Sequence, residues 1–185
     1  QALVRISSVN PAYDPESSGE APVVDWLEGW GRSHDLEPVR QPCLENHDNI
    51  NFTIRNGDGP HLLFNGHTDT VSVAGMTIDP FASHIREGRL YGRGACDTKG
   101  SGAAMLWALQ RYARIGEGGN NVALLFTLDE EIGKTGVRTF AQRQLPALGW
   151  SPAGAIVGEP TRLKLVVAHN GVVRWSIGAR GRAAH

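Results

Sequence analysis

The stretch HLLFNGHTD (residues 61–69) carries the pattern that decides the fold expected for this chain. Its first six residues are largely apolar and have the length of a β-strand, and histidine and aspartate follow directly after them. An almost wholly apolar run of this length is typical of a strand that is buried on both faces of a sheet.

The same order, a buried strand followed by polar side chains, occurs twice more along the chain. VALLFTL (122–128) runs into Asp129, Glu130 and Glu131, and GAIVG (154–158) runs into Glu159. NINFTIR (49–55) has β character as well. Because ligands bind outside the carboxyl ends of the strands in open α/β sheets, we expect these polar groups to meet at one sheet edge.

Helical periodicity fills the segments between the strands. Apolar residues recur at helical spacing in 1–9, 20–33, 99–115 and 135–144. Strands that alternate with helices predict an α/β fold with a mostly parallel sheet flanked by helices. A β-hairpin is expected across 84–92, within a glycine-rich stretch.

The pattern changes near the C-terminus. KLVVAHN (164–170) and VVRWSIGAR (172–180) read as two strands joined at Asn170-Gly171, which is a strong hairpin signal. We therefore expect a first domain over residues 1–170, which contains the polar groups at the strand ends, and the start of a second domain over 171–185. The chain opens without methionine and closes inside the predicted strand region, so we expect a fragment of a longer protein.

Composition excludes several classes of protein. A formal charge of -1 gives no electrostatic reason to expect nucleic acid or an anionic membrane as a partner. No apolar run approaches the roughly 18 residues of a membrane span, and no signal peptide is recognisable. Two cysteines, Cys43 and Cys96, do not form a disulfide framework, so free thiols in the cytoplasm are expected.

Convergent carboxylates and an imidazole indicate a metal site. His67, Glu131 and Glu159 follow buried strands, and Asp97 lies in a glycine-flanked turn directly before the long predicted helix. Carboxylates that lie within about 4 to 6 Å raise one another's pKa values, and a bound cation reverses this. A mixed histidine and carboxylate set favours zinc, although manganese and cobalt also fit. Asp69 is placed to accept the second ring N–H of His67.

Each of these signals also has an ordinary structural explanation. His67 with Asp69 fits a surface pair, the acids at 129–131 fit a solvated helix start, and Glu159 fits a turn. Asp97 fits a helix cap. Their joint placement at strand ends, in order, favours a common site.

At these residues the chain resembles a known family. The segments are HTDTV (67–71), YGRGACDTKGSGAA (91–104), DEEIGKTG (129–136), GEPT (158–161) and GRAAH (181–185). They resemble the acetylornithine deacetylase and succinyl-diaminopimelate desuccinylase family of two-zinc amidohydrolases, which includes aminoacylases, tripeptidases and glutamate-type carboxypeptidases. The resemblance covers nearly the whole chain and implies a zinc-peptidase-like catalytic domain, cut off at the start of a smaller α+β lid or dimerisation domain.

The resemblance also implies roles for single residues. His67 and Glu159 would bind one zinc, Glu131 the other, and Asp97 would bridge the two. Asp69 would orient His67, and the peptide bond between Asp97 and Thr98 is expected to be cis.

The catalytic groups follow from the same resemblance. Glu130 would act as general base and acid on a water activated by the two metals. His185 would reach the active site of the partner subunit in a homodimer and stabilise the oxyanion. A last metal-binding histidine is expected beyond residue 185, so the chain alone is expected to bind metal weakly and to be poorly active.

Three functions stay open. The leading one is hydrolysis of the amide bond of N-acyl amino acids, as in acetylornithine deacetylase or succinyl-diaminopimelate desuccinylase. The second is a di- or tripeptidase or carboxypeptidase of the same family. The third is a non-catalytic relative that binds metal or ligand, against which the intact acidic set argues.

Overall fold

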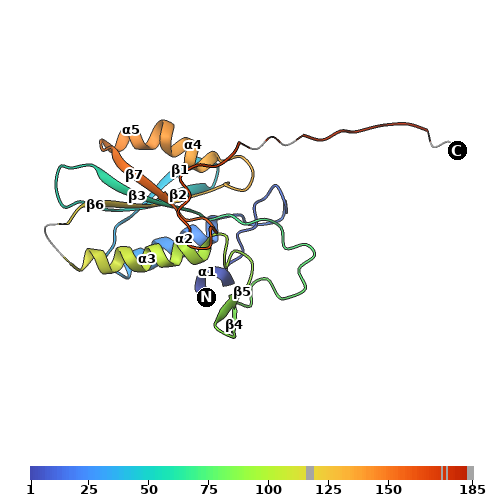
Figure 1. Ribbon diagram of the computed structural model, residues 1–185, viewed down its shortest axis with the longest axis horizontal. Helices are drawn as coiled ribbons and strands as arrows, with labels where there is room; N and C mark the ends of the chain where they lie inside the picture. Colours follow the sequence, from blue (N-terminus) through green and yellow to red (C-terminus); the bar gives the residue numbers. More distant parts are fainter. Residues whose placement is uncertain (116–118, 172, 174, 183–185) are drawn as a thin grey trace.

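A computed structural model describes residues 1–115, 119–171, 173 and 175–182 and shows one five-stranded sheet between helices (Figure 1). The strand order is β1-β2-β6-β3-β7. The strands are β1 (Pro38–Leu44), β2 (His47–Ile54), β3 (His61–His67), β6 (Asn121–Thr127) and β7 (Pro152–Val157). β6, β3 and β7 pair in parallel, whereas β2 is antiparallel to both β1 and β6, so β2 alone runs in the opposite direction. The expected α/β fold is confirmed.

Helices cover both faces of this sheet. α2 (Ala21–Arg32) and α3 (Lys99–Ala113) lie on one face, and α4 (Thr135–Thr139), a π-helical turn (Phe140–Gln144) and α5 (Leu145–Leu148) lie on the other (Figure 1). The predicted helices 20–33 and 99–115 agree with α2 and α3, and the one predicted over 135–144 extends to residue 148.

The prediction of a helix over residues 1–9 is wrong beyond Arg5. α1 comprises Ala2–Arg5. Farther on, the Ser8 hydroxyl donates to the carbonyl oxygen of Thr68 at 2.7 Å, and Val9 forms a β-bridge with Thr70. These contacts with the segment after β3 need an extended backbone, so they end the helix.

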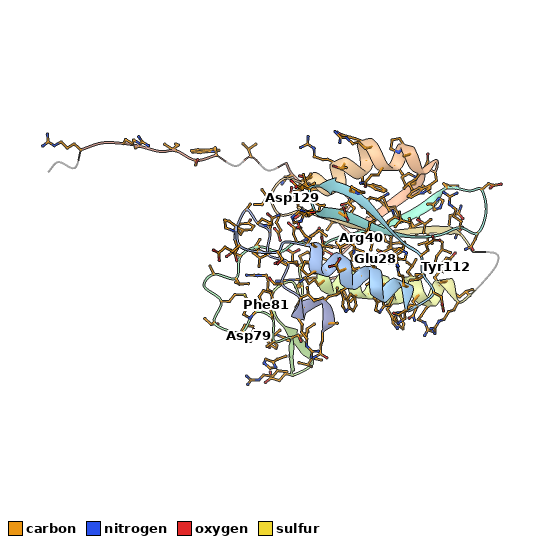
Figure 2. All side chains as sticks on the ribbon, turned by 180° about the vertical axis from the view of Figure 1, so that it is seen from behind. Glu28, Arg40, Asp79, Phe81, Tyr112 and Asp129 are labelled. Atoms are coloured by element: carbon orange, nitrogen blue, oxygen red, sulfur yellow. The ribbon has the colours of Figure 1, made fainter. Side chains whose placement is uncertain are left out.

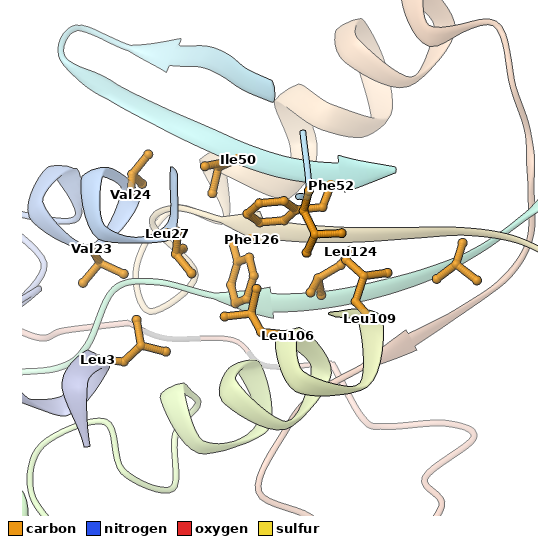
Figure 3. Packing of buried hydrophobic residues seen from close by; sticks show 12 residues of the cluster. Leu3, Val23, Val24, Leu27, Ile50, Phe52, Leu106, Leu109, Leu124 and Phe126 are labelled. Atoms are coloured by element: carbon orange, nitrogen blue, oxygen red, sulfur yellow. The ribbon is translucent and has the colours of Figure 1, made fainter. Parts of the chain in front are cut away.

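All residues of β6 are buried, and their side chains point alternately to the two faces of the sheet. Leu124 and Phe126 pack with α2 and α3 (Figure 3), as does Val122. Ala123 and Leu125 pack against Phe140 on the opposite face. Because successive side chains of a strand point to opposite faces, this one strand supports both helical layers.

β1 was not expected from the sequence. Two prolines, Pro38 and Pro42, lie within it, and proline is confined to edge strands because it cannot donate to the ladder. Arg40 fixes this edge to α2 through ion pairs of 2.6 Å with Asp25 and with Glu28 (Figure 2).

The C-terminal predictions are only partly correct. β7 forms, but all of its residues are exposed, with Ile156 at 49%, so its expected burial on both faces is wrong. β7 is an edge strand, and within the described residues no element packs on its outer side. The predicted strands 164–170 and 172–180 are not formed by the residues described there, because no described segment offers them a hydrogen-bonding neighbour; residues 172 and 174 lie outside the description.

Two smaller expectations can be compared with the structure. β4 (His84–Arg86) and β5 (Arg89–Tyr91) form the hairpin predicted over 84–92. Among the described residues, no helix combines the length and apolar character needed to cross a membrane.

Candidate metal centre

Three strand ends bring the polar groups together. β3 ends at His67, β6 leads into Asp129, Glu130 and Glu131, and β7 leads through Gly158 into Glu159. Since β6, β3 and β7 are parallel, their carboxyl ends lie at the same edge of the sheet, as the sequence predicts.

His67, Asp97 and Glu131 form the tightest group at this edge. One ligand atom from each lies within 4.8 Å of the others. The Nε2 atom of buried His67 is 2.9 Å from Oδ1 of Asp97. Asp97 lies just before α3, and its peptide bond with Thr98 is cis, as the resemblance implies. An imidazole nitrogen and two carboxylates are donors that zinc accepts.

Asp69 connects the histidine to the acidic loop. It is 1% exposed, and its Oδ1 lies 3.2 Å from Nδ1 of His67. The same ring nitrogen is 2.9 Å from the main-chain oxygen of Asp69. The carboxylate also accepts the main-chain N–H groups of Glu130 at 2.9 Å and Glu131 at 3.1 Å. Asp69 therefore orients the imidazole and also fixes the backbone of the two glutamates.

Opposing effects set the pKa values of these groups. Burial lowers the pKa of His67, but the hydrogen bond and charge of Asp69, with smaller contributions from Asp97 and Glu159, raise it to about 9. Burial raises the pKa of Glu131, and the charge of Asp97 raises it further. Partial desolvation of its carboxyl group by neighbouring protein atoms also raises the pKa of Glu159, where the charge of His67 acts against it and that of Asp97 adds to it. Acids whose ionised form is disfavoured in this way gain from a bound cation.

Glu159 and Glu130, two further predicted site residues, do not belong to this group of three. Glu159 is exposed and is not among the three residues whose ligand atoms lie within 4.8 Å of one another, although its charge acts on His67. The Glu130 carboxylate forms an ion pair with Lys134. His185 lies outside the described residues. Cys43 and Cys96 are both free thiols, and Cys96 is exposed.

Asn10 is a site residue that the sequence did not reveal. Its amide Nδ2 donates to Oδ2 of Asp69 at 2.9 Å and to Oδ1 of Asp129 at 3.0 Å. It thus joins the segment after β3 to the segment after β6. Asn10 precedes Pro11, a sequence typical of a turn, so nothing in the local pattern indicated this contact.

Glu20 and His47 support the same loop from behind. Buried Glu20 accepts the main-chain N–H of Asp129 at 3.1 Å, and its other oxygen lies 3.0 Å from Nδ1 of His47. Burial raises the pKa of Glu20, and the charge of Asp69 raises it further. At the sequence level, Glu20 looked like a residue at the start of a helix.

Close packing fixes the start of α3, which follows Asp97 directly. A Cβ on Gly102 would lie 2.8 Å from a ring carbon of Phe126, and one on Gly100 would collide with the main-chain oxygen of Ala95. Gly102 therefore lets the helix lie close to β6, and Gly100 lets the loop that contains Ala95 fold back onto the first turn of the helix.

Comparison with known proteins gives the class to which this fold and site belong. Residues 63–179, more than half of the chain, match Peptidase family M20/M25/M40. The chain belongs to this family.

Individual relatives agree with this assignment. The chain is 35% identical, over 99% of its own length and 49% of the relative's, to succinyl-diaminopimelate desuccinylase of Rhodospirillum centenum (strain ATCC 51521 / SW). It thus spans about half the length of that curated relative.

Two solved structures share the fold. The M20 family metallo-carboxypeptidase Sso-CP2 from Sulfolobus solfataricus is 22% identical with a TM-score of 0.73, over 85% of this chain and 35% of that one. YXEP protein of Bacillus subtilis, described as a dinuclear metal binding peptidase from the M20 family, is 22% identical with a TM-score of 0.55, over 84% of this chain and 40% of that one.

Proposed function

We propose that the protein is a metal-dependent hydrolase that cleaves the amide bond of N-acyl amino acids. The observation that carries the proposal is the group formed by His67, Asp97 and Glu131 at the carboxyl edge of the sheet. The desuccinylase of Rhodospirillum centenum, at 35% identity, supports an acyl amino acid as substrate.

The donor set fits two zinc ions, with cobalt and manganese as alternatives. His67 and Glu159 would hold one ion, Glu131 would hold the other, and Asp97 would bridge them. The fit rests on one buried imidazole whose Nδ1 faces Asp69, and on carboxyl groups whose pKa values are raised at the same edge. When bound, such ions lower the pKa of a water molecule and polarise a carbonyl oxygen.

Glu130 is the residue that we assign to proton transfer. Its neighbour Glu131 belongs to the candidate ligand group, whereas Glu130 does not. The main-chain N–H of Glu130 is fixed on buried Asp69, so the carboxylate starts from a defined position. It takes a proton from the attacking water and returns it to the departing amine nitrogen.

Lys134 holds the Glu130 carboxylate in the structure. The two residues lie four positions apart in the segment that follows β6, so the same segment supplies both partners of the ion pair.

His185 and the homodimer belong to the same proposal. His185 of a partner subunit would stabilise the oxyanion of the tetrahedral intermediate as a hydrogen-bond donor. The support for this comes from the GRAAH segment (181–185) and its resemblance to the family.

A peptidase of the same family is the second candidate. Peptide-bond hydrolysis is a candidate reaction because a metallo-carboxypeptidase and a dinuclear metal binding peptidase share the fold of this chain. A peptidase and a deacylase would use the same residues at the sheet edge, so these residues do not distinguish the two reactions. Activity assays with both kinds of substrate distinguish them.

The experiment measures amine release by the full-length, zinc-loaded protein from N-succinyl-diaminopimelate, N-acetyl-ornithine, other N-acyl amino acids and short peptides. We expect turnover of an N-acyl amino acid that a chelator abolishes. Turnover of peptides alone would assign the second candidate. If the protein binds metal but turns over none of the substrates, the proposed substrate class is wrong. If it neither binds metal nor turns over a substrate, a non-catalytic relative is favoured.

The Glu130→Gln variant tests the proton-transfer step. It should bind zinc as the parent does and lose turnover by a factor of about 10² to 10⁴. Glu37→Gln is the matched control, because Glu37 is exposed and directly precedes β1, at the edge of the sheet opposite the metal centre. A Glu130→Gln variant with near-normal turnover would remove Glu130 from this role.

A further inference from the structure

Residues 6–10 lie against two of the segments that carry the candidate metal ligands. The main-chain oxygen of Ile6 accepts a hydrogen bond from Nζ of buried Lys99, at the start of α3, at 2.7 Å. The Ser8 hydroxyl donates to the main-chain oxygen of Thr68, just after β3, at 2.7 Å. The backbone that leads to the last residue of this segment is therefore held from two sides.

That last residue, Asn10, is buried, with 4% of its surface exposed. Its Nδ2 donates to Oδ2 of Asp69 at 2.9 Å and to Oδ1 of Asp129 at 3.0 Å. Its Oδ1 accepts the main-chain N–H of Ala12 at 3.0 Å, and its own main-chain N–H donates to the oxygen of Thr70 at 2.9 Å. Both ends of the side-chain amide thus have partners, which define its orientation.

Asp129 in turn holds together the loop that carries Glu130 and Glu131. Its carboxylate accepts the main-chain N–H of Gly133 at 3.2 Å and the hydroxyl of Thr135. Its backbone has a φ of 55°, a left-handed conformation that a residue other than glycine keeps only where its surroundings hold it. A shift of Asp129 would therefore move the two glutamates with it.

The chemistry of an amide suits this position. Oxygens of Asp69 and Asp129 lie within 3.0 Å of the same nitrogen atom, and ionised carboxylates this close repel each other. The NH₂ group of asparagine offers a donor to each of them and adds no charge. Within the part of the chain that the structure describes, no other side chain is hydrogen-bonded to both acids. Asn10 therefore joins two acidic segments that would otherwise repel each other.

We propose that Asn10 is a positioning residue of the metal centre. Its two hydrogen bonds fix the loop that carries Glu130 and Glu131 relative to the imidazole of His67. Asn10 itself is neither a metal ligand nor a proton carrier. Its effect on metal binding depends on the candidate ligand group alone, whereas its effect on turnover rests on the proposed function.

Asn10→Asp and Asn10→Ala test this role through zinc affinity. Aspartate keeps the shape and the oxygen that accepts from Ala12, but it turns an oxygen toward two carboxylates. Alanine removes both donors without adding a charge, so it gives the result even if the aspartate variant does not fold. In a competition assay on the full-length protein, each variant should bind zinc more weakly by about tenfold or more.

Asn120→Asp is the matched control for the added charge. Asn120 is exposed and directly precedes β6, at the opposite end of that strand from Asp129, so its zinc affinity should stay unchanged. Unchanged zinc affinity of Asn10→Ala would overturn the proposal.

Turnover separates positioning from a purely structural role. At saturating zinc, Asn10→Ala should lower kcat by about 10- to 100-fold and leave KM within about twofold, because the substrate still binds while Glu130 is displaced. In the Glu130→Gln background the same replacement should lower kcat by less than about threefold, since the residue on which Asn10 acts has already lost its role. An equal loss in both backgrounds would overturn the positioning of Glu130 by Asn10. If the parent turns over no substrate, the proposed function fails, and the zinc affinities alone decide the role of Asn10.

Discussion

Replacement of Asp69 by asparagine changes one oxygen into an NH₂ group at the most heavily hydrogen-bonded carboxylate of the site. Oδ1 lies 2.9 Å from the N–H of Glu130 and 3.2 Å from Nδ1 of His67. Oδ2 lies 2.9 Å from Nδ2 of Asn10 and 3.1 Å from the N–H of Glu131. Whichever way the new amide turns, its NH₂ group faces two donors.

The expected loss follows from these contacts. Hydrogen bonds to a charged group contribute about 1.5 to 3 kcal/mol each, so two lost bonds cost about 3 to 6 kcal/mol of unfolding free energy. The side chain keeps its volume, so no cavity forms. Since small domains are stable by about 5 to 15 kcal/mol, the variant should be visibly destabilised.

Urea denaturation followed by tryptophan fluorescence measures the unfolding free energy. In parallel, zinc affinity should fall by about 10- to 100-fold, because His67 loses the group that orients it. Asp14→Asn is the matched control: Asp14 is exposed, its Oδ1 accepts the N–H of Glu16 at 3.2 Å, and asparagine offers the same oxygen. The control should stay within about 0.5 kcal/mol of the parent. A loss below about 1 kcal/mol for Asp69→Asn would refute this account of the carboxylate.

Three further predictions concern single positions. Glu131→Gln should weaken zinc binding by about tenfold or more in a competition assay, since a neutral amide replaces an anionic ligand; unchanged affinity would remove Glu131 from the centre. Burial lowers the pKa of Lys99 from 10.5 to about 8, so between these pH values the unfolded chain holds a proton that the folded chain has lost, and Lys99 contributes a rise in stability of about 3 kcal/mol. Below about pH 9 the loss of the proton from His67 acts in the opposite sense, so the contribution of Lys99 is read as the difference between the parent and a variant without the amine. The stability difference between the parent and Lys99→Met should therefore shift by about 3 kcal/mol in favour of the parent from pH 8 to pH 10.5 in denaturation curves, and a constant difference would contradict the lowered pKa of Lys99. Leu125→Ala should cost about 2 to 5 kcal/mol of unfolding free energy because Leu125 is buried beside Phe140, and a loss below about 1 kcal/mol would contradict that packing.

The central strands could be predicted because one local signal determines them. β3 and β6 combine an apolar run with polar residues directly after it, and both lie inside the sheet. β1 has the opposite character: Pro38 and Pro42 interrupt it, and it forms only because the antiparallel neighbour β2 pairs with it. β7 shows the limit of the rule, since its apolar residues predicted burial, whereas its position at the edge leaves them exposed.

Some site residues could be predicted from the sequence and others could not. Residues that follow a buried strand, such as His67 and Glu131, can be placed at a common edge by topology alone. Asn10 cannot, because its contacts reach Asp69, 59 residues away, and Asp129, 119 residues away. Such contacts depend on how distant loops cross, and no spacing in the sequence encodes them.

The two glycines at the start of α3 have a consequence for ion selectivity. The position of Asp97 relative to His67 depends on how far α3 stands from β6, and Gly102 sets that separation against Phe126. Ligand distances at a metal site agree within about 0.2 Å with the values typical of the bound ion, and ions differ in the bond lengths that they prefer. Gly102→Ala should therefore move Asp97 relative to His67, although neither ligand is replaced. We expect the variant to change the ratio of the affinities for zinc, cobalt and manganese.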